Sequence, residues 1–542
     1  MMMRITVVII YLLLSFKMVA SVSPNEFGLK NAKDGIERYW SLYRTHCEAL
    51  KLGTDVDYSG IDNIQLTIPQ DAKSIPLTKN TNFHGITITV ENKAKDIRLF
   101  TMMGEMKEIL VPQNRLDGTV FSDIGNWGDG VWLMILEDEI PWVKNRKGYN
   151  YGHKRRDVRL IIDGEAKNEA IMPYGNVKTT KPRCLLIKSD KSKKTIENIR
   201  IVRTKNSTRK TFCFYISGQN NLFMNNIKIE TPWNTGMVGD AAIAVKECTN
   251  VRLENIDIDG SYSTKDTYGY CMVIDTSWNV SLKHVRADAS WGVFYCSNLN
   301  KAYLEDCNVN RFDTHCYGKD YSFSHCYLHD LGMQISSVYG KILYTNCIFR
   351  NFEPVCLRLD YNSYVPFDLE IKDCTMHTGP ERNRIAYMGR VTDEINNRPE
   401  LKVKNWPNIK IDGLRIIPDD NTKSIYLYFV GGHVDENYPI QHLDNIDIKD
   451  LKIDGDAELY FCNQKVKTAR DVKSKIQQAR GYKPVKLEMD SEPVPILSKV
   501  IGKLGCKELF CERVVFSIPY VFLLFLSFLC GRVVSWNKKS WK

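Results

Sequence analysis

The chain is patterned in short runs that alternate apolar and polar residues, and similar runs recur along most of its length. Eight of them align on a shared fifth position, which is β-branched and apolar in the first four and cysteine in the last four. These fifth positions are Ile199, Ile227, Ile256, Val285, Cys307, Cys326, Cys347 and Cys374, spaced by 19 to 29 residues. The alternation has the two-residue period of a strand, and no helical period fits inside the units. The repeat predicts a solenoid of stacked turns.

The residue before each fifth position is polar and of a type that favours tight turns. These residues are Asn198, Asn226, Asn255, His284, Asp306, His325, Asn346 and Asp373. Asn and Asp tolerate the left-handed conformation and bond to neighbouring backbone groups. When the turns stack, these side chains are predicted to form a polar ladder at one corner, with His284 and His325 as substitutes for Asn.

With these repeats and this ladder, the chain resembles the right-handed parallel β-helix, or pectin-lyase-like, superfamily over roughly residues 61–461. The resemblance implies an all-β solenoid with three strands per coil and an asparagine ladder between the second and third strands. It says little about activity, because the superfamily holds lyases, hydrolases, phage tailspikes and adhesins. The Asn-Thr-Asp, paired Asp-Asp, Gly-His-Gly and Arg-Ile-Lys segments of polygalacturonase-like hydrolases are not found in order, and a pectate-lyase-like WIDH stretch is missing.

The four ladder cysteines are predicted to form an inward column of buried, reduced thiols. Sixteen cysteines in an exported chain would otherwise favour disulfides. Coils spaced by about 4.8 Å place small apolar thiols one above another. Zinc is disfavoured because no CxxC pair occurs.

Helices are expected at both ends of the solenoid, whose terminal coils need covers. Residues 31–53 place apolar side chains on one side at helical spacing, and Gly53 is a typical stop. This segment predicts a helix that caps the first coil. Residues 464–480 show a similar spacing with a strongly basic opposite face, which predicts a helical segment near the C-terminal end. Residues 483–503 then read as a linker.

The two ends of the chain carry apolar runs. Arg4 precedes the apolar run 5–16, and small residues follow, which predicts an export signal over residues 1–23. The run 514–531 is flanked by basic residues and predicts a C-terminal membrane anchor, although Pro519 and its marginal length argue against one. The alternative is a hydrophobic tail without a role.

The predicted organisation therefore has five parts. They are a signal peptide at 1–23, a capping-helix region at 24–56, the β-helix at 57–462, a helix and linker at 463–505, and a hydrophobic tail at 506–542. The net charge of +10 is modest for 542 residues and is spread along the chain, so it indicates no nucleic-acid partner.

Functional groups of this superfamily usually lie along the first strand of each coil and the loops that lead into it. Counting back from the ladder places first strands at 241–246, 271–275, 292–296, 314–317, 333–336 and 355–360. Outward positions on these strands, which are expected to be exposed, give the catalytic candidates Asp275, His315, Arg358 and Asp360, and the loop before the strand at 314–317 adds Asp313. The strands and loops together give the substrate-binding candidates Trp233, Asp240, Tyr262, Asp288, Trp291, Tyr295, Arg311, His329 and Asp330.

These residue types suit a polysaccharide, because carboxylates serve as acid and base in glycoside hydrolysis and aromatic faces stack on sugars. A lyase is the alternative chemistry, with Arg or His abstracting a proton while carboxylates hold Ca²⁺. The cofactor is otherwise unknown, and no resident metal site is predicted. The sequence thus predicts an exported protein of the cell surface, periplasm or extracellular space that cleaves a polysaccharide. The alternative is a β-helix that binds glycan or forms an adhesive surface without catalysis, since polar outward residues occur on any β-helix.

Overall fold

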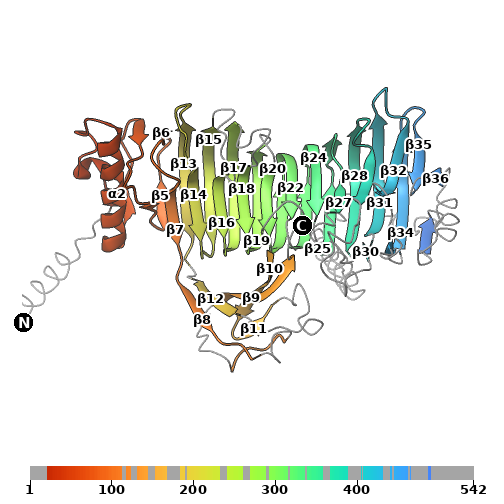
Figure 1. The fold of residues 1–542 in the computed structure, drawn as a ribbon, viewed down its shortest axis with the longest axis horizontal. Coiled ribbons are helices and arrows are strands. Elements are labelled where there is room, and N and C mark those ends of the chain that lie inside the picture. The colour runs from red at the N-terminus through yellow and green to blue at the C-terminus, as the bar shows by residue number, and fades with distance from the viewer. Residues whose placement is uncertain are drawn as a thin grey trace, which may run out of the picture. The chain divides into compact units, whose positions relative to one another are not determined.

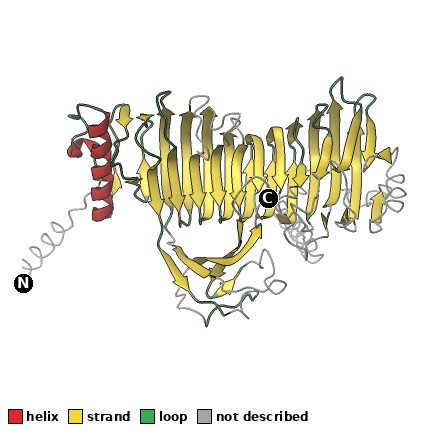
Figure 2. Ribbon diagram, viewed as in Figure 1, coloured by secondary structure: helices red, strands yellow, loops and turns green. Residues whose placement is uncertain are grey.

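The computed structural model contains a long stack of parallel strands preceded by the α-helix α2, Gly35–Leu52 (Figures 1 and 2). It describes residues 21–112, 118–123, 131–143, 153–167, 183–189, 192–231, 241–260, 269–287, 292–314, 318–335, 338–357, 367–388, 404–405, 407–430, 440–441, 445–461, 464–465 and 486–489. The predicted signal peptide and the hydrophobic run 514–531 lie outside these residues. Among the described residues, no helix has the length and apolar character needed to cross a membrane.

Parallel pairing between one coil and the next defines the fold as a parallel β-helix. Strands β13 (Lys194–Arg203), β15 (Leu222–Thr231), β17 (Thr249–Gly260) and β19 (Trp278–Ala287) each run through a ladder corner and pair in parallel with the next. Further coils continue through β21 (Leu299–Glu305), β23 (Gly318–Ser324), β25 (Val338–Thr345), β28 (Asp368–Thr378), β31 (Asn408–Pro418) and β34 (Asn445–Ile453). The predicted fold class is confirmed.

The first strands of the coils form one continuous face, which we call the first-strand face. It runs through β7 (Ile97–Met103), β14 (Thr211–Ser217), β16 (Ala241–Lys246), β18 (Tyr270–Asp275) and β20 (Gly292–Ser297). It then uses the ends of β22 (Asn308–Thr314) and β24 (Tyr327–Ile335), followed by β27 (Val355–Leu357), β29 (Arg384–Met388), β32 (Ser424–Val430) and β35 (Glu458–Phe461).

The polar ladder has the predicted backbone conformation. All eight predicted ladder residues have positive φ angles, between 51° and 61°. The Asn226 side chain donates to Asn198 Oδ1 at 2.8 Å, and the Asn346 side chain contacts His325 Nε2 at 3.2 Å. Stacked side-chain bonds therefore hold this corner in the left-handed conformation on successive coils.

The inward cysteine column is confirmed. Cys307, Cys326, Cys347 and Cys374 are free thiols with at most 3% of their surface exposed. The Cys326 thiol donates to the carbonyl oxygens of Leu304 and Ser324 at 3.5 and 3.3 Å. These four thiols therefore act as small core side chains.

We expect Cys326→Ser to lower the free energy of unfolding by roughly 1–3 kcal/mol, because a hydroxyl is more costly to bury than a thiol. Denaturant unfolding measures the change. Labelling of the native protein with a bulky thiol reagent, followed by peptide mapping, should modify the half-buried Cys47 well before Cys326. Rapid native labelling of Cys326 would contradict its inward placement.

The N-terminal cap is confirmed as the α-helix α2 (Gly35–Leu52), within the predicted 31–53. The Asp34 carboxylate accepts from the backbone N–H groups of Ile36 and Glu37, both at 2.9 Å, and Gly53 ends the helix with φ 65°. The helix packs on β3 (Ile64–Thr67) and β4 (Ile75–Pro76) in the first coil. It therefore covers the core at this end, as a solenoid requires.

The predicted C-terminal helix is not supported. The segment Gln464–Lys465, where that helix was expected to begin, is strand β36 and pairs antiparallel with β35. Residues 466–480 lie outside the described part of the chain. The helical spacing of apolar residues in 464–480 therefore gave a wrong prediction for Gln464 and Lys465, whose backbone is extended because it pairs with the edge of β35.

An antiparallel sheet, which the sequence analysis did not predict, is inserted in the solenoid between β7 and β13. This insertion contains β8 (Met106–Ile109), β9 (Val131–Val143), β10 (His153–Ile162), β11 (Glu165–Ala166) and β12 (Arg183–Ser189). The sheet buries Leu133, Ile135, Val158 and Ile187 together, with Trp278 of β19 packed against them. The insertion thus has an apolar contact with the β-helix.

Candidate functional site

The candidate site is the outward side of the first-strand face. Strand register aligns one outward position from each coil, and we call this row the outer column. It consists of Val273, Tyr295, Asp313, Gln334, Cys356, Tyr387 and Phe429. Tyr295 and Asp313 are therefore direct neighbours, as expected. Asp313 lies within β22, before the predicted strand at 314–317, and residues 315–317 lie outside the described part of the chain.

Asp313 is outward but fully buried, which contradicts the expected exposure. Its side chain is 0% exposed, and that of Arg311, also expected to be accessible, is 5% exposed. Arg311 Nη2 donates to Asp313 Oδ2 at 2.6 Å, and the Tyr270 hydroxyl donates to the same oxygen at 3.2 Å. These two donors hold the buried carboxylate in one orientation. Outward direction on a coil therefore does not guarantee contact with water.

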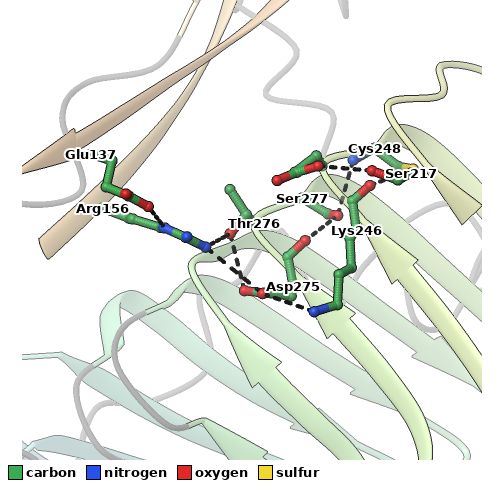
Figure 3. Close-up of polar contacts among 9 residues, drawn as sticks. Glu137, Arg156, Ser217, Lys246, Cys248, Asp275, Thr276 and Ser277 are labelled. Carbon is green, nitrogen blue, oxygen red and sulfur yellow. Dashed lines mark hydrogen bonds and ion pairs between the residues drawn. The ribbon is translucent and has the colours of Figure 1, made fainter. Parts of the chain in front are cut away.

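Asp275 contacts the insertion rather than Asp313 (Figure 3). Its Oδ2 lies 3.9 Å from Arg156 Nη1 of β10 and 3.8 Å from Lys246 Nζ of β16, and its side chain is 13% exposed. Arg156 also bonds to Glu137 of β9 and donates to Thr276 Oγ1 at 3.2 Å. Burial alone would lower the pKa of Arg156, but the carboxylates of Asp275 and Glu137 raise it. Asp275 thus joins the insertion to the first-strand face.

Asp275 and Asp313 are separated by two coils and by two residues along the strand direction. Asp275 pairs with Ser297, whereas Asp313 pairs with Tyr295. Strand spacing and rise place their Cα atoms on the order of 12 Å apart. This separation leaves room for water and a sugar between them, but each carboxylate already has a cationic partner.

Glu353 is a second buried carboxylate near this face, and it binds two arginines. Its side chain is 1% exposed; Arg382 donates to Oε2 at 2.8 Å, and Arg384 of β29 pairs with Oε1. Burial raises the pKa of Glu353 more than the two guanidinium groups lower it. Its backbone oxygen accepts from Met333 N at 3.0 Å, which fixes the residue beside β24.

Arg384, besides pairing with Glu353, contacts a group of stacked aromatic rings, which we call the aromatic platform. The platform consists of Tyr387, Tyr426, Phe429 and Tyr460, all half-buried. The rings of Tyr387 and Phe429 stack with centroids 6.0 Å apart, and those of Tyr426 and Tyr460 lie 5.3 Å apart. The Arg384 guanidinium lies 4.4 Å from the Tyr387 centroid and 5.3 Å from the Phe429 centroid.

The platform and its arginines were missed by the sequence analysis. Tyr426 and Phe429 lie in the segment 424–430, where aromatic residues alternate with apolar ones and the repeat is loose. This aromatic strand pattern was the available signal. Only the register across β29, β32 and β35 shows that rings from three coils meet.

His329 and Asp330 lie away from the first-strand face, which is a correction to their predicted place. His329 pairs with Arg350 of β26 (Ile348–Arg350), on the face formed by the strands that follow the ladder. We call it the third-strand face. Positive φ angles of 69° at Asp330 and 82° at Gly332 turn β24 from this face to the first-strand face. His329 Nδ1 contacts Asp330 Oδ2 at 2.7 Å, and its Nε2 contacts Asn308 Oδ1 at 3.0 Å.

The remaining predicted residues are outside what the structure describes. These are His315, Arg358, Asp360, Trp233, Asp240, Tyr262, Asp288 and Trp291, together with the side chain of Tyr295. Among the described residues, no three or more His, Cys, Asp or Glu side chains gather as metal ligands. Of the predicted site, the structure therefore brings together Arg311, Asp313 and the strand position of Tyr295, and places Asp275 on the same face.

Comparisons with known proteins find similar solved structures only. No protein-family model matches the chain, and no curated protein does. The tailspike gp49 of Pseudomonas phage LKA1 is 13% identical, with 81% of this chain and 78% of that chain covered and a TM-score of 0.47. The gp54 tailspike of Acinetobacter baumannii bacteriophage AP22, in complex with capsular saccharide, is 11% identical over 81% and 76%, with a TM-score of 0.46. The Streptococcus pneumoniae surface protein and adhesin PfbA is 10% identical, with 82% of this chain and 100% of that chain covered and a TM-score of 0.34.

The class of protein is established by the strand register itself. The chain is a parallel β-helix protein with a capping helix and an inserted antiparallel sheet.

Proposed function

We propose that this chain is an exported β-helix protein that binds a polysaccharide along its first-strand face. The aromatic platform is the observation that carries the proposal. Stacked, half-buried rings from three successive coils give an apolar strip parallel to the direction in which the coils stack. The apolar faces of sugar rings pack on such aromatic surfaces, and a strip of this direction suits a linear polymer.

Charge around the platform supports a glycan ligand as well. Arg382 and Arg384 carry two positive charges, and the single carboxylate of Glu353 offsets only one of them. Bidentate guanidinium donors suit sugar hydroxyl and carboxylate oxygens. The platform therefore has both apolar and hydrogen-bonding contacts to offer to a saccharide.

Cleavage of the bound polymer is a second candidate function, and Glu353 is the observation that favours it. A buried carboxyl with a raised pKa is the kind of group that donates a proton in glycoside hydrolysis. In this version Asp313 and Asp275, with His315, Arg358 and Asp360, remain proposed partners in the chemistry. A lyase would need Ca²⁺ or another charge-stabilising group in addition.

A panel of polysaccharides tests both functions in one experiment. Affinity electrophoresis of the purified protein measures binding, while reducing ends and the absorbance of unsaturated uronates measure cleavage. We expect Tyr426→Ala to weaken binding of the retained polysaccharide about tenfold or more, because it removes one stacking ring. Tyr303→Ala is the matched control, since Tyr303 is 43% exposed on a second strand outside the platform.

Three outcomes separate the alternatives. Binding without product favours the non-catalytic function, and product formation that Glu353→Gln abolishes favours hydrolysis or elimination. Equal loss of binding in Tyr426→Ala and Tyr303→Ala, or binding unaffected by Tyr426→Ala, would remove the platform from the site. The melting temperature of each variant shows whether a loss reflects unfolding.

A further inference from the structure

The turn between β13 and β14 carries a motif that the proposed function does not use. Its residues are Asn206, Ser207 and Thr208, so that a threonine follows the asparagine by two positions with no proline between them. An asparagine in this setting is an acceptor for N-linked glycosylation of exported proteins when it lies in a surface loop. The three residue types are common, so the surface presentation of the asparagine decides whether it can serve.

Asn206 lies at the centre of a tight, hydrogen-bonded turn. Ser207 N donates to Thr204 O at 3.1 Å, which places Lys205 and Asn206 at the two central positions of the turn. Both central residues are exposed, and the Asn206 side chain makes no hydrogen bond to any residue that the structure describes. The amide nitrogen of Asn206 is therefore open to a transferase at the surface.

The base of this turn is fixed to the preceding coil. Ser207 is 8% exposed, and its hydroxyl accepts from Asn92 N at 3.0 Å and donates to Val90 O at 3.3 Å. Thr208 N donates to Asn92 O at 2.8 Å, while the Thr208 side chain is exposed. Both side chains that define the motif, Asn206 and Thr208, thus project from a fixed turn, and a glycan there requires no rearrangement of the coil.

The sequence contains the motif a second time, in a setting that does not suit a glycan. Asn279, Val280 and Ser281 form this second copy within β19. The Asn279 side chain is half-buried and donates to Asn250 Oδ1 at 2.7 Å, and Asn279 has a φ of 57°. A glycan on Asn279 would disturb this stacked hydrogen bond between coils. Of the two motifs, the fold therefore leaves Asn206 as the acceptor.

We propose that Asn206 carries an N-linked glycan in the exported chain, with a lipid-pyrophosphate-linked oligosaccharide as the donor. Asn206 Nδ2 attacks C1 of the first sugar, so that the Nδ2–C1 bond forms and the bond from C1 to the pyrophosphate oxygen breaks. One amide proton is released, the lipid pyrophosphate is the leaving group, and nothing is oxidised or reduced. The proposal rests on export, which is part of the proposed function.

A glycan at this turn leaves the aromatic platform open. The turn leads directly into β14, and seven parallel pairings separate β14 from β29 along the first-strand face. Strand spacing makes this separation on the order of 34 Å. The modified asparagine and the proposed polysaccharide site therefore lie on different parts of the β-helix.

Expression of the full-length chain in insect cells, whose export route contains oligosaccharyltransferase, tests the proposal. We expect the exported chain to lose the mass of one glycan when it is treated with peptide N-glycosidase F. This enzyme converts the modified asparagine to aspartate, and peptide mapping should find that change at position 206. Asn206→Gln and Thr208→Ala each destroy the motif and should abolish the mass shift. Ser281→Ala is the matched control, since it destroys only the second motif and should leave the shift unchanged.

The location of the chain separates failure of this proposal from failure of the proposed function. An exported chain without a glycan on Asn206, or a mass shift that persists in Thr208→Ala, overturns the proposal and leaves the proposed function intact. A glycan on Asn279 of the folded, exported chain overturns the assignment of Asn206 as the acceptor. A chain that stays in the cytosol overturns both, because export itself then fails.

Discussion

Asp313→Asn is expected to lower the free energy of unfolding by about 3–5 kcal/mol, since it removes one charge of a buried ion pair. Asp313 is 0% and Arg311 is 5% exposed at the side chain, and their 2.6 Å contact is shielded from water. The asparagine keeps the shape of the side chain but leaves the buried guanidinium without its anionic partner. Denaturant unfolding monitored by fluorescence measures the effect.

A double variant is the control for this prediction. Arg311→Met with Asp313→Asn removes both charges, and we expect it to regain at least half of the stability lost in the single variant. Asp306→Asn supplies a matched exposed site, because its side chain is 41% exposed, and it should change stability by less than about 1 kcal/mol. If Asp313→Asn unfolds at the wild-type denaturant concentration, the pair is not buried as described.

The cap should make the protein sensitive to acid through His46. Its ring is 0% exposed inside α2, Nε2 contacts the Tyr58 hydroxyl at 2.7 Å, and burial lowers the pKa of His46 to about 3. In the unfolded chain histidine titrates near 6.5, so below that pH the unfolded state binds the additional proton. Stability contributed by the neutral ring is present above about pH 6.5 and is lost as the pH falls toward 3.

His46→Gln tests this prediction, because glutamine can still bond to Tyr58 but does not titrate. Between pH 6.5 and 5 the wild type should lose about 1–2 kcal/mol more than the variant, at up to about 1.4 kcal/mol per pH unit. Urea unfolding at closely spaced pH values measures both curves. Parallel curves for the wild type and the variant would show that His46 does not carry the acid sensitivity.

The coils were predictable from sequence because their determinants are local. Each ladder residue, such as Asn255, needs only its own turn conformation and an apolar neighbour such as Ile256, and the pattern repeats on the eight coils from β13 to β28. The cap helix is equally local, since Asp34 and Gly53 bound an amphipathic segment. The antiparallel insertion was not predictable in this way. Side chains alternate between the two faces of a strand in an antiparallel sheet just as they do in a coil, so the sequence pattern does not distinguish the two.

The candidate site was less predictable because its properties depend on several coils. The burial of Asp313 depends on Tyr270, which is 43 residues earlier in the chain. The aromatic platform depends on the register of β29, β32 and β35, whose coils are longer and align poorly with the repeat. His329 was misplaced because β24 passes from one face to another without a break in the strand. The alternation of a strand can be counted from sequence, but the residues that each side chain meets on other coils cannot.

The insertion occupies the place of a very short turn. Met103 pairs with Ser217, and Lys194 pairs with Leu222, so residues 104–193 connect the same two points that residues 218–221 connect one coil later. The two ends of the insertion are thus held as close together as the ends of a four-residue loop. The connection at this corner can therefore be four residues or a whole inserted sheet while the coils keep their register. The entropic cost of closing such a connection grows only with the logarithm of its length. The corner between β7 and β13 is therefore a natural point of exchange in the architecture, where the fold can acquire or lose a module without being rebuilt.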